Sequence, residues 1–426
     1  MTAPPEILDV QISGLHANGF GVAHVPGLGH LYVPFAFPGQ QVTVTHIKEV
    51  RSGQWQGELV DKPFHHCSLA GRCGGCLWPA VEYAAQLREK EQLFRRGIAR
   101  MPAIANLPIN IHAAPQATGY RSRLHLHANF FQQKFEFGFY AKGTRTPLPV
   151  TQCAVASPAL QQTVTGLTAL RSQNFEVVQD FGFGIELIDL VEEGKVLMTL
   201  YSTPERRDLL RTVQPVLAAA DRNAIVALAH VDDATLFRWQ RIGDVQMYTR
   251  AGCFQQVNRA QSDTIREILR IYLTETNSRT LLDLYSGSGN YSLPFARLVA
   301  LIRGFDENQV GIGVAQHNLQ QNNITNAQYT CADTASALRQ MLNEPDSPSP
   351  DLVILDPARF GIGPEVPALL QRLHPRAVAL VSNRMQAFTT DARRLLAAQF
   401  RPTKLHLVDC FPFTPHWNVV SFWRNT

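Results

Sequence analysis

Residues 281–296 read LLDLYSGSGNYSLPFA, and this stretch decides the fold of the chain. The apolar run Leu281 to Leu284 predicts a buried strand that carries Asp283. It breaks into the turn Ser286-Gly287-Ser288-Gly289, and the pattern Tyr291 to Leu298 then predicts a helix. An α/β sheet presents its first loop to a nucleotide-like ligand in this way, because glycine lets the backbone approach the ligand closely.

The strands predicted after this turn each end in a carboxylate. The apolar stretches Leu298 to Phe305 and Leu352 to Leu355 are followed by Asp306 and Asp356, and a short predicted strand from Ala327 to Cys331 is followed by Asp333; a helix is predicted at Val310 to Asn323. Because the carboxyl ends of parallel strands meet at one edge of a sheet, we expect these acids to line a ligand site. Asp306 comes about 20 residues after the glycines, where an acid can bind ribose hydroxyls.

The residues after the glycines distinguish two nucleotide cofactors. Asn290, Tyr291 and Ser292 follow Gly289, so that there is no third glycine for the close helix packing of a dinucleotide site. S-adenosylmethionine (SAM) fits better than NAD because it has no pyrophosphate to cradle. The alternative is a set of ordinary strand-end turns with solvated acids.

Composition predicts a folded protein of two or three domains. The chain has 426 residues, of which 45% are hydrophobic and 17% are charged. No apolar run is long enough for a membrane span, and the N-terminus does not resemble a signal peptide, so we expect a cytoplasmic protein without membrane contact. The net charge of +4 indicates a weak preference for polyanionic partners. Seven cysteines in a cytosolic chain favour metal or catalytic roles over disulfides.

We predict three domains. Residues 1–62 contain short alternating strands, such as Ile7 to Ile12 and Gln41 to Thr45, separated by Gly/Pro turns, which is typical of an OB-like β barrel. Residues 63–250 form an α+β middle domain. Residues 251–426 form a doubly wound, Rossmann-like α/β domain, so that the fold class is α/β multidomain.

A group of cysteines predicts a metal centre in the middle domain. Cys67, Cys73 and Cys76 are closely spaced, with Gly74 and Gly75 relieving the backbone crowding between the last two, and Cys153 follows much later. His65 and His66 are either rival ligands or, as is more common, ordinary surface or packing residues. Four sulfurs suit tetrahedral zinc or a [4Fe–4S] cluster, and spacing alone does not choose between them. A redox pair at Cys73 and Cys76 is the alternative.

The middle domain also predicts an RNA-facing surface. In Tyr120 to His127 the arginines and histidines fall on one face of a strand, and Phe135 to Tyr140 is an aromatic-rich strand followed by Lys142 and Arg145. Cations suit phosphates and rings stack on bases, so this pattern is compatible with RNA binding. A solvated basic face of an amphipathic sheet is equally compatible.

Taken in order, these motifs resemble the SAM-dependent RNA uracil-C5 methyltransferases, particularly their iron–sulfur 23S rRNA branch. The resemblance covers nearly the whole chain, and it is carried by the cysteine group, Gly138-Phe139-Tyr140, Gln152-Cys153, Phe254 to Asn258, Asp283 to Asn290 (DLYSGSGN) and Asp356 to Gly361 (DPARFG). It implies a TRAM barrel, a class I methyltransferase domain, a monomer, and rRNA or tRNA as the acceptor. It also implies a [4Fe–4S] cluster, rather than zinc, on Cys67, Cys73, Cys76 and Cys153. The implied SAM-binding residues are Gln256, Tyr285, Gly287, Gly289, Asn290, Asp306, Asp333 and Asp356.

The chain departs from this family at the catalytic positions. Asn383 stands where the family has its nucleophilic cysteine, and Asn418 stands where it has its catalytic glutamate. Uracil C5 is a poor nucleophile until a thiolate adds at C6, and a base must then remove the C5 proton. Asparagine does neither, so we predict no 5-methyluridine formation by the family route. Cys410 is either a relocated thiol or a buried strand residue.

Three hypotheses follow. In the first, an active RNA methyltransferase has changed target chemistry, with Asp356, Asn383 and His416 orienting the base and Arg359 contacting a phosphate or the target edge. In the second, the chain is a catalytically inactive RNA-binding paralogue; the two asparagines and Phe413, which replaces a family histidine, favour it. The third is methylation of a protein or small molecule on the same scaffold.

Overall fold

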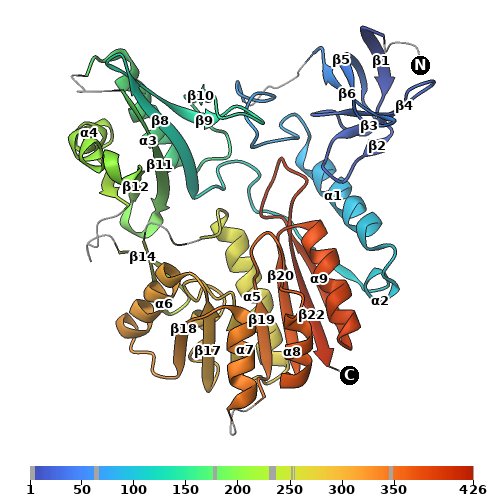
Figure 1. Ribbon diagram of the computed structural model, residues 1–426, viewed down its shortest axis with the longest axis vertical. Coiled ribbons are helices and arrows are strands. Elements are labelled where there is room, and N and C mark those ends of the chain that lie inside the picture. Colours follow the sequence, from blue (N-terminus) through green and yellow to red (C-terminus); the bar gives the residue numbers. More distant parts are fainter. Residues whose placement is uncertain are drawn as a thin grey trace.

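A computed structural model describes the chain in three sheet-containing parts (Figure 1). It describes residues 5–61, 67–175, 180–229, 237–250, 253, 255–344 and 349–425. His65, His66 and Phe254, which the sequence analysis singled out, lie outside these residues.

The C-terminal part is built on a mixed sheet of eight strands. Its order is β18 (Ala327–Cys331), β17 (Leu301–Asp306), β16 (Thr280–Leu284), β19 (Leu352–Leu355), β20 (Ala377–Ser382), β22 (Asn418–Asn425), β21 (Phe400–Val408) and β7 (Ile109–His112). The first five strands of this order pair in parallel, and β22 runs antiparallel to both β20 and β21. This confirms the predicted α/β class.

Helices cover both faces of this sheet (Figure 1). They are α5 (Arg259–Glu275), α6 (Gln309–Gln321), α7 (Thr334–Asn343), α8 (Val366–Leu373) and α9 (Met385–Ala397). The neighbouring residues Leu281 and Leu282 of β16 belong to two different hydrophobic clusters, as expected for a strand that is buried on both faces.

The helix predicted from Tyr291 to Leu298 is wrong. Only Leu293–Phe295 is helical, as a short 3₁₀ turn. Pro294 lacks an N–H, and its ring disfavours the helical conformation of the residue before it. The glycine turn is therefore not followed by a regular helix N-terminus, which agrees with a ligand that has no pyrophosphate.

The N-terminal part is a six-stranded sheet around its own small core. Its order is β1 (Ile7–Gln11), β5 (Gln41–Arg51), β6 (Gln54–Leu59), β4 (Gly29–Val33), β3 (Gly21–Val25) and β2 (Gly14–Leu15). Leu31, Val33 and Val44 are fully buried in it. The assignment of this part to the TRAM class stays a prediction.

The middle part is a second six-stranded sheet. Its order is β10 (Pro147–Pro149), β9 (Lys134–Tyr140), β8 (Arg123–Phe131), β11 (Phe181–Leu190), β12 (Lys195–Tyr201) and β13 (Ala224–Leu228), with helices α3 (Pro158–Ala169) and α4 (Arg207–Ala220) packed on it. Along β8, Leu124 and Leu126 are buried whereas His125 is exposed, so the predicted alternation of this strand is confirmed.

Two segments within the range predicted for the middle domain pack on the C-terminal sheet. Helices α1 (Tyr83–Ile98) and α2 (Pro102–Ala105) contribute to its core, and β7 pairs with β21 as its edge strand. The hairpin β14 (Arg238–Ile242) and β15 (Val245–Thr249) joins the core that α5 covers. Among the described helices, none has the length and apolar character required to cross a membrane.

Candidate functional site

The glycine turn after β16 is held by a carboxylate of the next strand. Asp306 accepts the N–H of Gly287 at 2.8 Å through Oδ2 and that of Asn308 at 2.7 Å through Oδ1. Gly289 has φ +81°, and a Cβ on it would lie 2.8 Å from the Tyr329 hydroxyl, so that only glycine fits there. Asp306 therefore joins the turn to the start of α6, and its remaining lone pairs are available to a ligand.

Three carboxylates converge at the carboxyl edge of the sheet. Burial, together with the charges of Asp283 and Asp306, raises the pKa of Asp356 to about 8. Burial likewise raises the pKa of Asp283 to about 7, against a hydrogen bond from the Ser292 hydroxyl that lowers it. Such mutual repulsion is relieved by a cationic ligand, and SAM carries a sulfonium and an ammonium group. This carboxylate group fits SAM.

The other predicted SAM-binding residues surround this edge. Tyr285 has φ +64°, and its hydroxyl accepts the N–H of Gly363 at 3.4 Å. The amide oxygen of Asn290 accepts a hydrogen bond from Arg266 at 2.7 Å, and Gln256 lines a small pocket beside them. Asp333 caps α7 by accepting two backbone N–H groups, with an exposed side chain.

A cavity of about 740 Å³ is lined by residues of both the C-terminal and the middle part. Four cysteines line one side of it, and Gln256, Arg359 and Asn383 line another. The cavity also includes Arg121, Arg123, His125, Tyr140, Phe411 and Phe413. Cations and rings therefore surround one space that is large enough for a nucleotide.

The two asparagines lie at the same edge of the sheet. The β20–β22 pairing ends with Ser382 opposite Val419; Asn383 directly follows β20, and Asn418 is the first residue of β22, where it pairs with Val408 of β21. Asn383 is partly exposed to the cavity. Asn418 is 1% exposed, and neither polar atom of its side chain has a hydrogen-bond partner among the described residues. Leaving a buried amide unsatisfied is costly, so this side chain needs a polar partner that the described residues do not supply.

Cys410 is a poor substitute for the missing nucleophile. Its thiol is buried, and burial together with the negative charges of Asp409 and Asp356 raises its pKa. A thiol attacks as the thiolate, so these surroundings hold Cys410 in its unreactive form. The structure agrees with the reading of Cys410 as a packing residue of the strand end.

The four predicted metal-ligating cysteines share the cavity. Burial, together with the neighbouring Cys153 and Cys73, raises the pKa of the Cys76 thiol to about 12. The Arg121 guanidinium opposes this shift. Among the described residues, however, no three or more Cys, His, Asp or Glu side chains form a group arranged to hold a metal ion. The donor chemistry suits a cluster, and the ligand set stays a prediction.

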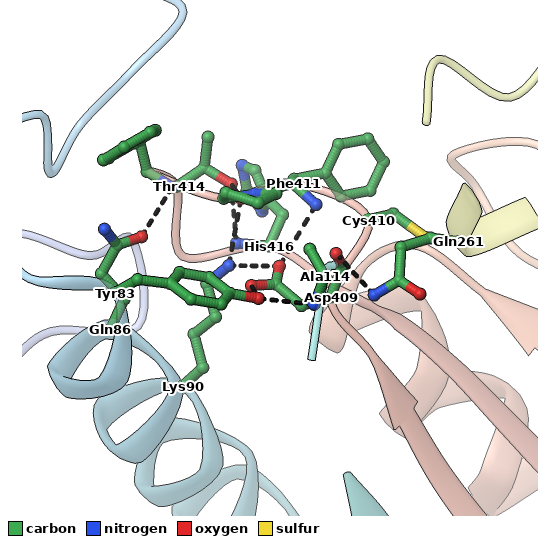
Figure 2. A network of polar contacts seen from close by, with 12 residues as sticks. Tyr83, Gln86, Lys90, Ala114, Gln261, Asp409, Cys410, Phe411, Thr414 and His416 are labelled. Carbon is green, nitrogen blue, oxygen red and sulfur yellow. Dashed lines mark hydrogen bonds and ion pairs between the residues drawn. The ribbon is translucent and has the colours of Figure 1, made fainter. Parts of the chain in front are cut away.

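The loop between β21 and β22 is clamped by residues that the sequence analysis missed (Figure 2). Lys90 of α1 forms a buried ion pair with Asp409 at 2.6 Å and donates a hydrogen bond to the Phe411 carbonyl at 3.0 Å. Tyr83 donates to the other carboxylate oxygen of Asp409, and Gln86 accepts the N–H of Phe413 at 2.6 Å. The clamp fixes the backbone that leads into Asn418.

The sequence contains a pattern that places Lys90 of this clamp on the buried face of a helix. Gln86, Lys90, Phe94 and Ile98 recur every fourth residue, and all four are buried. A lysine on an otherwise apolar stripe needs a buried partner. The sequence does not say which acid it meets, since Asp409 lies 319 residues away.

The remaining predicted catalytic residues lie around the cavity. Arg359 is exposed and lines it, whereas His416 and Asn418 are not among its lining residues. Partial burial, followed by the charges of Lys90, Arg384 and Arg359, lowers the pKa of His416. His416 is therefore neutral near pH 7, and a neutral imidazole offers one donor and one acceptor.

Comparisons with known proteins agree with this geometry. A family model described as tRNA (uracil-5-)-methyltransferase matches residues 82–423. The chain is 28% identical to a 23S rRNA (uracil(1939)-C(5))-methyltransferase RlmD of Edwardsiella ictaluri, over 100% of this chain and 97% of that protein. It is 29% identical to an uncharacterized RNA methyltransferase of Thermosynechococcus vestitus, over 97% of each chain.

A solved structure shares the whole fold. The Pyrococcus abyssi tRNA (uracil-54, C5)-methyltransferase, in complex with S-adenosyl-L-homocysteine, has a TM-score of 0.72 and 21% identity. The match covers 97% of this chain and 99% of that one, so it includes all three sheets.

Proposed function

The chain belongs to the tRNA (uracil-5-)-methyltransferase family of SAM-dependent RNA methyltransferases, and we propose that it methylates an rRNA or tRNA base without the covalent adduct of that family. The proposal is carried by Asn383 and Asn418, which lie at the same edge of the sheet, where β20 ends and β22 begins, and which the resemblance aligns with the family's nucleophile and base. Neither amide forms a covalent adduct with C6 or removes a proton from C5.

A target nitrogen needs no adduct. Methylating an exocyclic amine or ring nitrogen requires only a lone pair aimed at the methyl group that SAM supplies. Asp356 would accept a hydrogen bond from an N–H of the base and take the released proton. Asn383, which lines the cavity, would offer a donor and an acceptor to the base edge, with the neutral His416 as a further polar contact and Arg359 on a phosphate. The buried Asn418 would keep the adjoining edge of the sheet polar. The unsatisfied amide of Asn418 supports a polar, rather than apolar, edge.

We also propose that Cys67, Cys73, Cys76 and Cys153 hold a [4Fe–4S] cluster that shapes the RNA surface. Support comes from their shared cavity. Burial raises the pKa of the Cys73, Cys76 and Cys153 thiols, and a cluster would keep these thiols ionised. Its position beside His125 and Tyr140, on the exposed face of the middle sheet, suits a structural role.

The experiment uses anaerobically purified protein, methyl-labelled SAM, and total RNA from a strain that lacks the gene. The RNA is digested to nucleosides, and mass spectrometry locates the label. We expect label on a base nitrogen. Label on uracil C5 would show that the covalent route survives without the cysteine and the glutamate, and would contradict the proposal.

A catalytically inactive RNA-binding protein is the second candidate. The specific observation in its favour is that both catalytic positions have lost their reactive groups, together with the family histidine at Phe413. No label on any RNA, combined with measurable binding of SAM and RNA, would support this candidate instead.

A further inference from the structure

One aromatic side chain next to the cavity is almost completely exposed. Phe360 is 96% exposed, whereas the next most exposed large apolar side chain of the described residues, Ile7, is 61% exposed. Single exposed apolar residues are common on protein surfaces, so exposure alone assigns no role. The position of Phe360 is the second observation: it follows Arg359, which lines the cavity, and lies four residues after Asp356.

The turn that carries Phe360 is firmly anchored. Gly361 has φ +76° and donates its N–H to the Ala358 carbonyl at 2.9 Å. A Cβ on Gly361 would collide with the carboxylate of Asp391. The side chain of Asp391 has no exposed surface, and it accepts the N–H of Ile362 at 3.1 Å. The ring of Phe360 is therefore presented to solvent by a fixed turn, which lowers the entropy cost of binding.

Positive charge surrounds this turn. Arg359 and Arg384 are both exposed, and both lower the pKa of His416, so that their charges act on the same region of the surface. Neither guanidinium has an ion-pair partner among the residues that the structure describes. An aromatic ring beside unpaired cations suits an unpaired nucleotide, whose base stacks while its phosphate meets the cation.

We propose that Phe360 is a stacking platform for an unpaired RNA base, with Arg359 or Arg384 on the adjoining phosphate. The inference rests on the proposed function, because it concerns the RNA acceptor of the same site. The nucleotide on Phe360 is a neighbour of the target rather than the target itself, since the 96% exposure of the ring places it outside the cavity.

The test measures the affinity of the full-length protein for a fluorescein-labelled single-stranded RNA of mixed sequence. We expect Phe360→Ala and Phe360→Leu to weaken binding by about 5- to 100-fold, the range that base–aromatic stacking gives. Phe360→Tyr keeps the ring and should bind like the wild type. Leu298→Ala is the matched control, because Leu298 is 52% exposed but precedes β17 and so lies at the opposite edge of the sheet.

Abasic substitution distinguishes stacking from a structural role. Removing the base at one position of the RNA should weaken wild-type binding and leave Phe360→Ala binding unchanged, as a double-mutant cycle requires for two groups in contact. Loss of affinity in Phe360→Ala at every abasic position alike would overturn the stacking assignment.

The outcomes separate the two proposals. If the wild type methylates RNA and Phe360→Ala binds the oligonucleotide as tightly as the wild type, the inference is wrong and the proposed function stands. The inference is also wrong if a protein that methylates RNA does not bind single-stranded RNA. If the wild type neither methylates nor binds any RNA, both proposals fail.

Discussion

The Nζ atom of Lys90 lies 2.6 Å from Oδ1 of Asp409, and neither side chain has any exposed surface. The pair joins α1 to the loop that leads into Asn418, across 319 residues of sequence (Figure 2). Both charges also make hydrogen bonds within the loop, to the carbonyl and the N–H of Phe411. The pair therefore fixes the position of the β21–β22 loop relative to the strands beside it.

Removing one member of this pair should be costly. We expect Lys90→Met to lower the free energy of unfolding by about 3–5 kcal/mol, because it leaves the carboxylate of Asp409 buried without its partner. The double variant Lys90→Met/Asp409→Asn should recover part of this loss. Urea denaturation measures both. Arg297→Met is the control: its pair with Asp244 is 73% and 79% exposed, and its loss should cost at most about 1 kcal/mol. If Lys90→Met and Arg297→Met lower the free energy of unfolding by the same amount, the stabilising role of the buried pair is contradicted.

The converging carboxylates predict a pH-dependent stability of the ligand-free protein. The pKa of Asp356 is raised from 3.8 to about 8, so between these values the folded state holds a proton that the unfolded state has lost. Stability should therefore fall as pH rises from about 4 to about 8. Asp356→Asn should flatten this fall, and thermal unfolding at several pH values measures it. An unchanged slope would show that Asp356 is not the group responsible.

The same carboxylates predict that SAM binds more tightly at higher pH. Between about pH 6 and pH 8, Asp283 and Asp356 become ionised, and carboxylates attract a cationic ligand better than neutral acids do. Calorimetric titration with SAM should show affinity rising through this range in the wild type and a weaker rise in Asp356→Asn. An affinity that falls with rising pH would exclude this arrangement.

Restoring both family groups should change the reaction product. We expect the double variant Asn383→Cys/Asn418→Glu to form 5-methyluridine, since the two positions lie at the same edge of the sheet, where β20 ends and β22 begins. Each single variant should form 5-methyluridine at least about 100-fold more slowly than the double variant, because general-base catalysis alone contributes about that factor to the rate. Labelled SAM and nucleoside analysis provide the measurement. No 5-methyluridine from the double variant would show that other residues also exclude this route.

The cysteine prediction has a direct chemical readout. Anaerobic protein should be brown, with about four iron and four sulfide per chain, as a [4Fe–4S] centre requires. Cys153→Ser should lose iron, whereas Cys331→Ser should retain it, because Cys331 is exposed and does not line the cavity. Stoichiometric zinc without iron would show that the four cysteines hold a zinc ion and not a cluster. A colourless protein without metal would remove the ligand set altogether.

Local patterns were sufficient for most elements of the C-terminal sheet. The strands at Leu352–Leu355 and Ala327–Cys331 were predicted with their observed bounds. The first is a continuous apolar segment because it is buried on both faces. The helix after the glycine turn failed because a single proline outweighed an apolar pattern. The predicted range of the middle domain includes α1, β7 and the β14–β15 hairpin, which pack on the C-terminal sheet. The apolar face of an element does not indicate which sheet it covers.

The sequence by itself determined the chemistry that is available: a glycine turn, acids at strand ends, four cysteines, and asparagine at two reactive positions. These follow from residue identity and spacing along the chain, which are local properties. Only the tertiary structure decided which of these groups meet. Strand pairing placed Asn383 and Asn418 at the same edge of the sheet, packing brought Lys90 to Asp409, and an anchored turn left Phe360 in solvent. Such relationships depend on contacts between distant segments, and burial then sets the energy of each charge and each unpaired amide.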